Sequence, residues 1–320
     1  MMSAVRAVVQ AGGEPVTRLM ERVEARMFEL AIGHGQLLAL HAGDTIAAGG
    51  KRLRPLLLCL AAGVPTPETE RLVRAAVAVE LVHGATLVHD DVLDGSPLRR
   101  GRPTVVAAAG RRLATATGDL LFSRAFAELA GGSLHSVRVL SRASSELAAG
   151  ELMQRHDAWN VNVELERYLE RCRLKTAVLF RAACELGAIE GGGEVGALGL
   201  FGEQIGLAFQ ILDDVLDVAG PPERTGKPQG ADLLDGTVTL PLIIARARDP
   251  ELARIDIRGL TGVDDARQVC QLISATGALA KAKGQALELV TGAKSMLPSL
   301  PDRQRAALEL VADGVVERYS

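Results

Sequence analysis

Two identical acidic segments are the residues of this sequence most suited to chemistry. The pentapeptide DDVLD stands at residues 90–94 and again at residues 213–217, each time near the end of a long apolar segment. On an α-helix the first and fifth residues of such a segment share a face, and the second flanks it. Like charges at this spacing destabilise a helix, and the C-terminal end of a helix disfavours anions. The repeated arrangement therefore indicates a compensating cation, and all-oxygen ligation favours Mg²⁺.

A magnesium site of this kind predicts a phosphorylated substrate and basic side chains to hold it. Mg²⁺ is usually bound by one or two carboxylates together with substrate phosphates. The metal-ligand candidates are Asp90, Asp91, Asp94, Asp213, Asp214 and Asp217, and the basic candidates are Lys51, Arg52, Arg54, Arg99, Arg100, Lys175 and Lys227. A single DDxxD on an exposed helix is most often a solvated acidic patch, and a lone lysine or histidine is usually structural. Two copies, each followed by a basic glycine-containing loop, favour the functional interpretation.

Composition excludes several classes of protein. The chain has 320 residues, 48% hydrophobic and 23% charged, which fits a folded globular protein and not a disordered one. A net charge of −3 excludes a globally basic nucleic-acid binder, and 3% aromatic residues argue against base-stacking surfaces. The four cysteines form no C-x-x-C pair, so we expect reduced, mostly buried thiols. No signal peptide or run of 18 apolar residues is present, which predicts a cytoplasmic protein without stable membrane insertion.

The elements that must position these side chains are helices. The sequence is rich in Ala and Leu, has helical periodicity and is divided by Gly and Pro clusters, so we expect one all-α domain spanning residues 1–320. Thr66 and Pro67 form a helix start of the N-cap and first-turn type. The expected helices cover residues 16–33, 53–62, 67–94, 114–130, 136–154, 165–187, 196–218, 239–247, 265–275, 278–297 and 303–318.

Eight motifs in a fixed order make the sequence resemble the trans-type isoprenyl diphosphate synthases of the polyprenyl synthetase family. They are GGKRLRP at 49–55, HGATLVHDDVLD at 83–94, LRRGRPT at 98–104, GD at 118–119, GELMQ at 150–154, KT at 175–176, FQILDDVLD at 209–217 and GKPQGADLLDGTVTLP at 226–241. The resemblance implies the all-α isoprenoid synthase fold, a bundle of long helices around a deep central cavity, usually as a homodimer. It also implies condensation of isopentenyl diphosphate with an allylic diphosphate.

The resemblance assigns a role to each matching residue. The six aspartates are expected to bind the Mg²⁺ ions, typically three, that hold the allylic diphosphate. Thr176 and Gln210 are expected to line the reacting centre and steady the cation. The basic residues divide between two diphosphates: Lys51, Arg54, Arg100 and also His83 for isopentenyl diphosphate, and Arg99, Lys175 and Lys227 for the allylic diphosphate.

Product length is expected to depend on the residues one turn or more before the first aspartate motif. In the family these residues shape the floor of the product tunnel. Here Thr86, Ala85 and Val82 are all of modest size, which favours geranylgeranyl diphosphate or a longer product. A large residue from another helix, such as Phe122, Phe126 or Met153, is the alternative floor.

Two other functions stay open at this point. A class I terpene cyclase shares the helical ancestry, but it usually carries an Asn/Ser/Glu-type second metal motif and needs no isopentenyl diphosphate site. A subunit of a heteromeric synthase usually loses aspartates, and all six are present here. A chain-elongating prenyltransferase is the interpretation that accounts for every motif.

Overall fold

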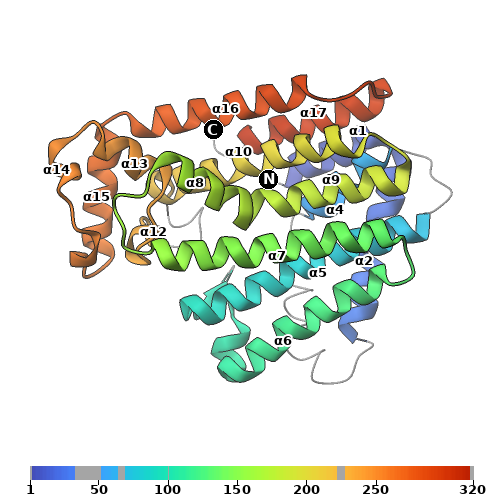
Figure 1. Cartoon of the computed structure of the whole chain (residues 1–320), viewed down its shortest axis with the longest axis horizontal. Helices are drawn as coiled ribbons and strands as arrows, with labels where there is room; N and C mark the ends of the chain where they lie inside the picture. The colour runs from blue at the N-terminus through green and yellow to red at the C-terminus, as the bar shows by residue number, and fades with distance from the viewer. Residues whose placement is uncertain (1, 33–51, 64–68, 100, 222–227, 318–320) are drawn as a thin grey trace. The chain divides into compact units, whose positions relative to one another are not determined.

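The computed structural model describes residues 2–32, 52–63, 69–99, 101–221 and 228–317, and nearly all of them are helical (Figure 1). The all-α prediction is confirmed. The chain forms two compact units, neither of which is a continuous stretch of sequence. The first comprises Met1–Ser144, Leu179–Gly202 and Met296–Gly314, and the second comprises Ser145–Val178, Glu203–Ser295 and Val315–Ser320. The prediction of a single domain stays a prediction.

The elements follow one another in this order. From the N-terminus they are α1 (Met2–Gly12), α2 (Glu14–Ile32), α4 (Leu53–Ala62), α5 (Thr69–Asp94), strands β1 (Leu98–Arg99) and β2 (Arg102–Pro103), α6 (Val105–Leu129), α7 (Leu134–Asp157), α8 (Leu165–Cys172), the π-helical turn η1 (Arg173–Ala177) and α9 (Val178–Gly191). They continue with α10 (Val195–Ala219), α12 (Ala231–Leu234), α13 (Leu240–Arg246), α14 (Pro250–Ala253), the 3₁₀ turn η2 (Ile257–Gly259), α15 (Val263–Ala275), α16 (Ala278–Ser295) and α17 (Asp302–Glu317).

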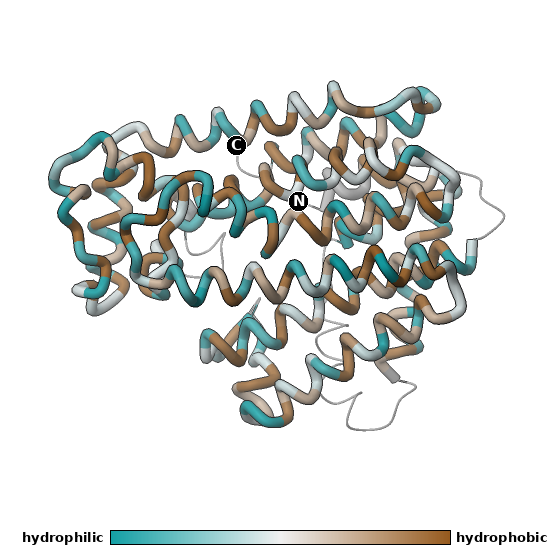
Figure 2. Tube along the Cα trace, in the orientation of Figure 1, coloured by the Kyte–Doolittle hydropathy of each residue, from teal (hydrophilic) through white to brown (hydrophobic). Residues whose placement is uncertain are grey.

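Helix α5 is the centre of the first unit. It contacts α2, α4 and α6, and Figure 1 shows α5 and α6 side by side. Its side chains from Leu72 to Val82 are buried at nearly every position, because neighbours cover the helix on several sides. Along most other helices hydrophobic and hydrophilic residues alternate (Figure 2), as expected for helices with one buried face. Full burial of each Leu or Val contributes about 1.5–3 kcal/mol, so α5 is a rigid support for the motif at its end.

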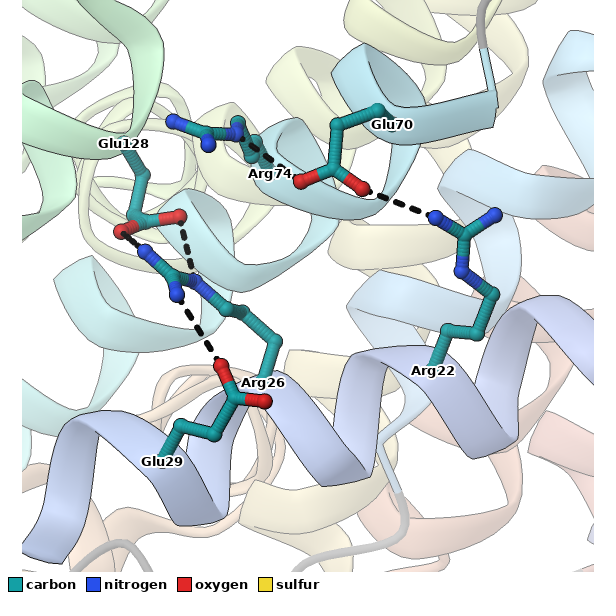
Figure 3. Close-up of polar contacts among 6 residues, drawn as sticks. All are labelled: Arg22, Arg26, Glu29, Glu70, Arg74 and Glu128. Carbon is teal, nitrogen blue, oxygen red and sulfur yellow. Dashed lines mark hydrogen bonds and ion pairs between the residues drawn. The ribbon is translucent and has the colours of Figure 1, made fainter.

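Ion pairs tie α2 to its neighbours in the first unit. Arg22 donates to Glu70 at the start of α5 at 2.8 Å, and Arg26 donates to Glu128 of α6 at 2.8 Å and 3.1 Å (Figure 3). Glu128 is buried, so its carboxylate depends on the Arg26 guanidinium for compensation. Glu70 also accepts from Arg74 one turn along α5. The buried Arg26–Glu128 pair therefore fixes the register of α2 against α6.

Close backbone contact joins α9 to α4. A Cβ atom at Gly187 would lie inside contact distance of the Leu58 carbonyl oxygen, and one at Gly191 would meet the Ala62 carbonyl oxygen. Only glycine allows this approach at both positions. Helix α17 is fixed to α4, because the Gln304 amide donates to the carbonyl oxygen of Leu60 at 2.9 Å.

The second unit packs around α13. This helix contacts α8, α14, α15 and α16, and Leu240, Leu242 and Ile273 are fully buried. Residues 249–275, in which we recognise no sequence motif, form α14, η2 and α15. Asp249 caps α14 by accepting from the amides of Glu251 and Leu252, and Pro250 takes the first helical position. This segment therefore forms part of the second unit.

The expected helix boundaries agree with the structure where glycine or proline residues flank the helix. Helix α4 has the expected bounds, and α5 ends at Asp94 as expected; its expected start, at Thr66 and Pro67, lies outside the described residues. Helix α6 begins nine residues earlier than expected, because the Thr104 hydroxyl caps Ala107 and a non-helical Gly110, at φ 81°, joins two helical segments. Helix α1 and the β1–β2 hairpin were not expected. The hairpin pairs Arg99 with Arg102 and carries no alternating apolar pattern.

Two of the described helices are long and apolar enough to cross a membrane. They are α5 and α10, whose most apolar windows are 67% and 56% buried within the protein. Core helices have the same length and composition, so the test does not separate the two possibilities. The prediction of no stable membrane insertion stays a prediction.

Candidate active site

The first aspartate motif ends α5, and a basic residue folds back onto its middle carboxylate. Asp91 is 5% exposed, and the Arg99 guanidinium donates to both of its oxygens from the β1–β2 hairpin, at 2.8–3.1 Å. Asp90 is half-buried and Asp94 is exposed. The protein therefore neutralises the middle carboxylate, and the outer two, on one helix face, keep the exposure that a metal ligand needs.

The Gly-Asp motif of α6 supports the residue before this motif. A Cβ atom at Gly118 would collide with the His89 ring, whose Nε2 lies 3.2 Å from Asp119 and 3.3 Å from the carbonyl oxygen of Thr115. The Phe122 ring stacks on His89 with centroids 5.8 Å apart. Gly118 thus leaves the space in which His89 packs, which explains why the motif requires glycine.

Arg54 has an unused donor suited to an anion. Its guanidinium lies over the Phe180 ring, 4.5 Å from the centroid, and its buried Nε has no hydrogen-bond partner among the described residues. Burial lowers the pKa of Arg54 to about 10, so the group is charged at neutral pH. The predicted partners Lys51 and Arg100 lie outside the described residues, and His83 is half-buried on α5.

Arg52, beside Arg54, is a structural residue. It has a left-handed φ of 47° and donates to the buried Glu80 of α5 at 2.9 Å and to Glu24 of α2 at 2.7 Å. A non-glycine residue in this conformation is strained unless its surroundings hold it. The ion pairs to α5 and α2 therefore fix the start of α4, from which Arg54 projects.

The chain-length candidates lie in the packed interior of the first unit. Val82 and Ala85 are fully buried, and the Thr86 hydroxyl donates to the carbonyl oxygen of His83 at 2.8 Å. Phe122 and Phe126 of α6 are half-buried. A larger side chain at Ala85 or Val82 would have to displace neighbouring residues. The chain-length role of these positions stays a prediction.

The second aspartate motif, in α10, also has an engaged middle carboxylate. Asp214 is 3% exposed and accepts from the Tyr168 hydroxyl at 2.6 Å and from the Gln210 amide at 2.7 Å. The Thr176 hydroxyl donates to the Gln210 carbonyl oxygen at 2.6 Å. Burial, followed by the nearby Asp232, raises the pKa of Asp214 above its ordinary range, against the effect of these hydrogen bonds. The structure therefore joins the predicted residues Thr176, Gln210 and Asp214 in one network.

The outer residues of the second motif are half-buried, and a further acid lies beside them. Asp217 accepts from the backbone amide of Asp232 at 3.3 Å, which ties α12 to the end of α10. Asp213 and Asp217 share a helix face, as Asp90 and Asp94 do. Asp232 was not expected as a site residue, although its position in the GKPQGADLLDG motif carried the signal.

Lys175 is held by Glu151, which was not expected as a site residue. Its Nζ lies 2.6 Å from a carboxylate oxygen of Glu151, which belongs to the GELMQ motif. Lys175 and Thr176 stand on the π-helical turn η1, a geometry that recurs at functional sites. A Cβ atom at Gly150 would lie 2.6 Å from the backbone nitrogen of Lys175, so glycine permits α7 to approach η1. Lys227, the third basic candidate of this diphosphate, lies outside the described residues.

The donor set fits Mg²⁺ bound together with a phosphorylated substrate. Within the described ranges no three His, Cys, Asp or Glu side chains converge to form a complete metal-binding group. Each motif instead offers a pair of carboxylates one helical turn apart, which is the small ligand number that Mg²⁺ uses when phosphates and waters supply the rest. The predicted roles of the individual aspartates stay predictions.

Comparison with known proteins identifies the family. The sequence matches the family model described as polyprenyl synthetase over residues 36–274. It is 40% identical over 275 residues to heptaprenyl diphosphate synthase component 2 of Geobacillus stearothermophilus, covering 84% of this chain and 85% of that protein.

Two solved structures resemble this chain over almost its whole length. A decaprenyl diphosphate synthase from Rhodobacter capsulatus has a TM-score of 0.87 and 35% identity, and 99% of each chain is covered. A polyprenyl synthase from Caulobacter crescentus CB15, complexed with calcium and isoprenyl diphosphate, has a TM-score of 0.89 and 36% identity, covering 100% of this chain and 98% of that one. The chain therefore belongs to the polyprenyl synthetase family of trans-isoprenyl diphosphate synthases and has the all-α isoprenoid synthase fold.

Proposed function

We propose that this prenyltransferase condenses isopentenyl diphosphate head-to-tail onto an allylic diphosphate in a Mg²⁺-dependent reaction. The observation that carries the proposal is the pair of intact DDVLD motifs. In each motif the protein fixes the middle carboxylate, and the outer carboxylates are half-buried or exposed. Asp90, Asp94, Asp213 and Asp217 are the residues best placed by exposure to hold the metal, which we take to be three ions. A terpene cyclase is disfavoured because its second motif usually differs from DDVLD.

When bound, Mg²⁺ supplies positive charge that stabilises the departing diphosphate. The chain's own residues bind and orient the reactants. Arg54 offers its unpaired buried Nε to the diphosphate of isopentenyl diphosphate, and Lys175 is positioned by Glu151 for the allylic diphosphate. The Thr176 and Gln210 oxygens are fixed in a half-buried network, where they steady the allylic cation. The double bond of isopentenyl diphosphate attacks this cation to form the new carbon–carbon bond, and the proton then lost passes to the departed diphosphate. Apolar, Ala- and Leu-rich helices keep water away from that cation.

A long product is the version of this reaction that we propose. The heptaprenyl and decaprenyl names of the relatives support a product of geranylgeranyl length or longer. On the chain itself, the positions expected to shape the tunnel floor, Ala85, Thr86 and Val82, carry side chains of modest size.

We predict that Ala85→Phe shortens the product by at least one isoprene unit, as measured by sizing the dephosphorylated products. The matched control is Ala127→Phe at an exposed position of α6, which leaves the product length unchanged. An unchanged product from Ala85→Phe places the floor of the tunnel elsewhere.

The active assembly proposed is a homodimer in the cytoplasm. The name of the Geobacillus stearothermophilus relative contains the word "component". This name supports one alternative, in which the chain is a subunit that requires a second protein. Light scattering of the purified chain, together with an assay of the same fraction, separates the two. A dimer that is active alone supports the homodimer, and a chain that is inactive alone supports the heteromeric subunit.

The deciding experiment is a product assay with the purified protein. Labelled isopentenyl diphosphate is incubated with dimethylallyl, geranyl, farnesyl or geranylgeranyl diphosphate, with Mg²⁺ or with a chelator. We expect a ladder of products that ends at one length and disappears with the chelator. Consumption of an allylic diphosphate without isopentenyl diphosphate points to a cyclase and contradicts the proposal.

A further inference from the structure

Tyr168 is a buried tyrosine whose only polar atom is committed to the second aspartate motif. It lies on α8, fully buried, and its hydroxyl donates to Asp214 Oδ2 at 2.6 Å across 46 residues of sequence. A neutral hydroxyl that donates to a carboxylate forms one of the stronger hydrogen bonds in proteins. The Tyr168 hydroxyl therefore holds Asp214 in one orientation.

The orientation of Asp214 determines the orientation of two residues beyond it. The Gln210 NH₂ group points toward Asp214 and donates to its Oδ1 at 2.7 Å. The Gln210 carbonyl oxygen then faces Thr176, whose hydroxyl donates to it at 2.6 Å. One chain of hydrogen bonds thus runs from Tyr168 to both residues that are proposed to line the reacting centre.

Tyr168 is itself held by its neighbours. The Arg171 guanidinium lies over the Tyr168 ring, 5.6 Å from the centroid, and Arg171 is buried and donates to the carbonyl oxygen of Val238. The Cys172 thiol, one turn after Tyr168, also interacts with its hydroxyl. Burial and these neighbours restrict the tyrosine ring to one position beside Asp214.

We propose that Tyr168 is a positioning residue for prenyl transfer: through Asp214 it fixes the Gln210 amide, and with it the Thr176 hydroxyl, toward the reacting centre. This inference rests on the proposed function. The ring of a phenylalanine fills the same space, so the contribution belongs to the hydroxyl alone. Loss of the hydroxyl leaves Asp214 Oδ2 without its donor and frees Gln210 to rotate.

The test compares Tyr168→Phe with the wild type in kcat, in KM for both substrates and in metal binding. We expect kcat to fall about tenfold, the lower end of the effect of outer supporting groups, with both KM values unchanged within twofold. Binding of Mn²⁺ with inorganic diphosphate, measured by calorimetry without any reaction, should be unchanged. Weaker Mn²⁺ binding by the same factor as kcat would place the effect on the metal and overturn the inference.

A double-mutant cycle tests the route of the effect. If Tyr168 acts through Gln210, the variant with both Tyr168→Phe and Gln210→Ala has the same kcat as Gln210→Ala alone. Multiplicative losses would mean that Tyr168 acts by another route and would overturn the inference. The matched control is Ser136→Ala, which removes another fully buried hydroxyl that donates to a carboxylate, Glu190, at 2.8 Å. An equal loss of kcat in the control would show that the loss in Tyr168→Phe comes from general destabilisation, and it would overturn the inference.

The inference and the proposed function fail in different ways. A wild-type protein that forms no polyprenyl product with any primer overturns the proposed function, and the inference falls with it. An active wild type whose Tyr168→Phe variant has the same kcat overturns the inference alone.

Discussion

At the scale of single residues, the two aspartate motifs share one arrangement of their side chains. In each, the middle carboxylate is buried and engaged by the protein, by Arg99 in the first and by Tyr168 and Gln210 in the second. The first and fifth carboxylates keep more exposure. Like charges one helical turn apart repel, and a cation bound between them would reduce that repulsion. This arrangement supports the proposed metal site.

Replacing one outer aspartate of either motif is therefore expected to remove activity and leave the fold intact. For Asp90→Ala and Asp213→Ala we expect kcat to fall roughly a hundredfold or more, the scale of loss when one group of an electrostatic site is removed. The melting temperature without metal should change little, because both side chains are only half-buried and lie outside the apolar core. Steady-state kinetics and thermal unfolding measure the two quantities. Asp264→Ala, at an exposed aspartate of α15, serves as the control, and normal turnover in either motif variant would contradict the metal assignment.

The ion pair between Lys175 and Glu151 predicts a pH dependence of stability. Burial favours the protonated form of Glu151, but Lys175 and Arg155 outweigh it and lower the pKa of this carboxyl below its ordinary value. The folded state thus binds this proton less tightly than the unfolded state. The stabilisation is complete above the ordinary glutamate pKa and is lost as pH falls through the lowered value.

The pH prediction is tested by melting curves of Glu151→Gln and wild type between pH 7 and pH 3. We expect the variant to melt at a lower temperature at pH 7 and the difference to narrow below about pH 4. Glu288→Gln, at an exposed position of α16, corrects for the loss of one negative charge. A difference that stays constant down to pH 3 would show that the ion pair does not stabilise the fold.

The sequence allowed the residue types of the site to be predicted, but not their supporting partners. DDVLD, KT and the other motifs have fixed local spacing, and helix periodicity is enough to place their side chains on faces. Tyr168 and Asp214 are 46 residues apart, and Lys175 and Glu151 belong to different helices. Such pairs depend on how helices pack against one another, and the spacing of residues along the sequence does not predict this packing.

At the scale of elements, helix ends flanked by glycine and proline were predictable, and irregular joints were not. The bounds of α4 followed from the flanking glycines and prolines, and the last residue of α5 from the loop after Asp94. The kink at Gly110 and the π-helical turn that begins at Arg173 interrupt segments whose composition is helical throughout. The π-helical turn lies against Gly150 of α7, so it depends on tertiary packing, which overrides local propensity. The kink at Gly110 has a φ of 81°, which glycine adopts without strain. The hairpin that carries Arg99 is too short to give a strand pattern.

Close packing of α9 on α4 gives an element-scale prediction. Gly187→Ala forces a methyl group against the Leu58 carbonyl oxygen, so one helix must move away from the other. We expect a loss of about 1–3 kcal/mol in the free energy of unfolding, the usual cost of overpacking. Gly284→Ala, on α16 with open space around it, should instead gain about 0.5–1 kcal/mol from the better helix propensity of alanine. Urea unfolding measures both, and equal effects would show that α9 and α4 are not in backbone contact.

At the scale of the whole molecule, the chain passes repeatedly between its two compact units. The first ends at Ser144, resumes at Leu179 and again at Met296, so neither unit is assembled from one continuous segment. Each segment of one unit continues directly into a segment of the other, so unfolding of either unit frees segment ends of the other. We therefore expect the two units to unfold together, as the predicted single domain requires.

The four cysteines provide a measurement of this cooperativity, because they are free, buried and divided between the units. Cys59 and Cys184 belong to the first unit, and Cys172 and Cys270 to the second. Burial raises the pKa of Cys59 and of Cys270 to about 12, so at pH 8 only about one such thiol in ten thousand is a reactive thiolate. We expect almost no labelling by a thiol reagent in the native state. All four sites should then become labelled at the same urea concentration, as resolved by peptide mass spectrometry. Labelling of Cys59 and Cys184 at a lower urea concentration than Cys172 and Cys270 would mean that the units unfold separately and would refute the single-domain prediction.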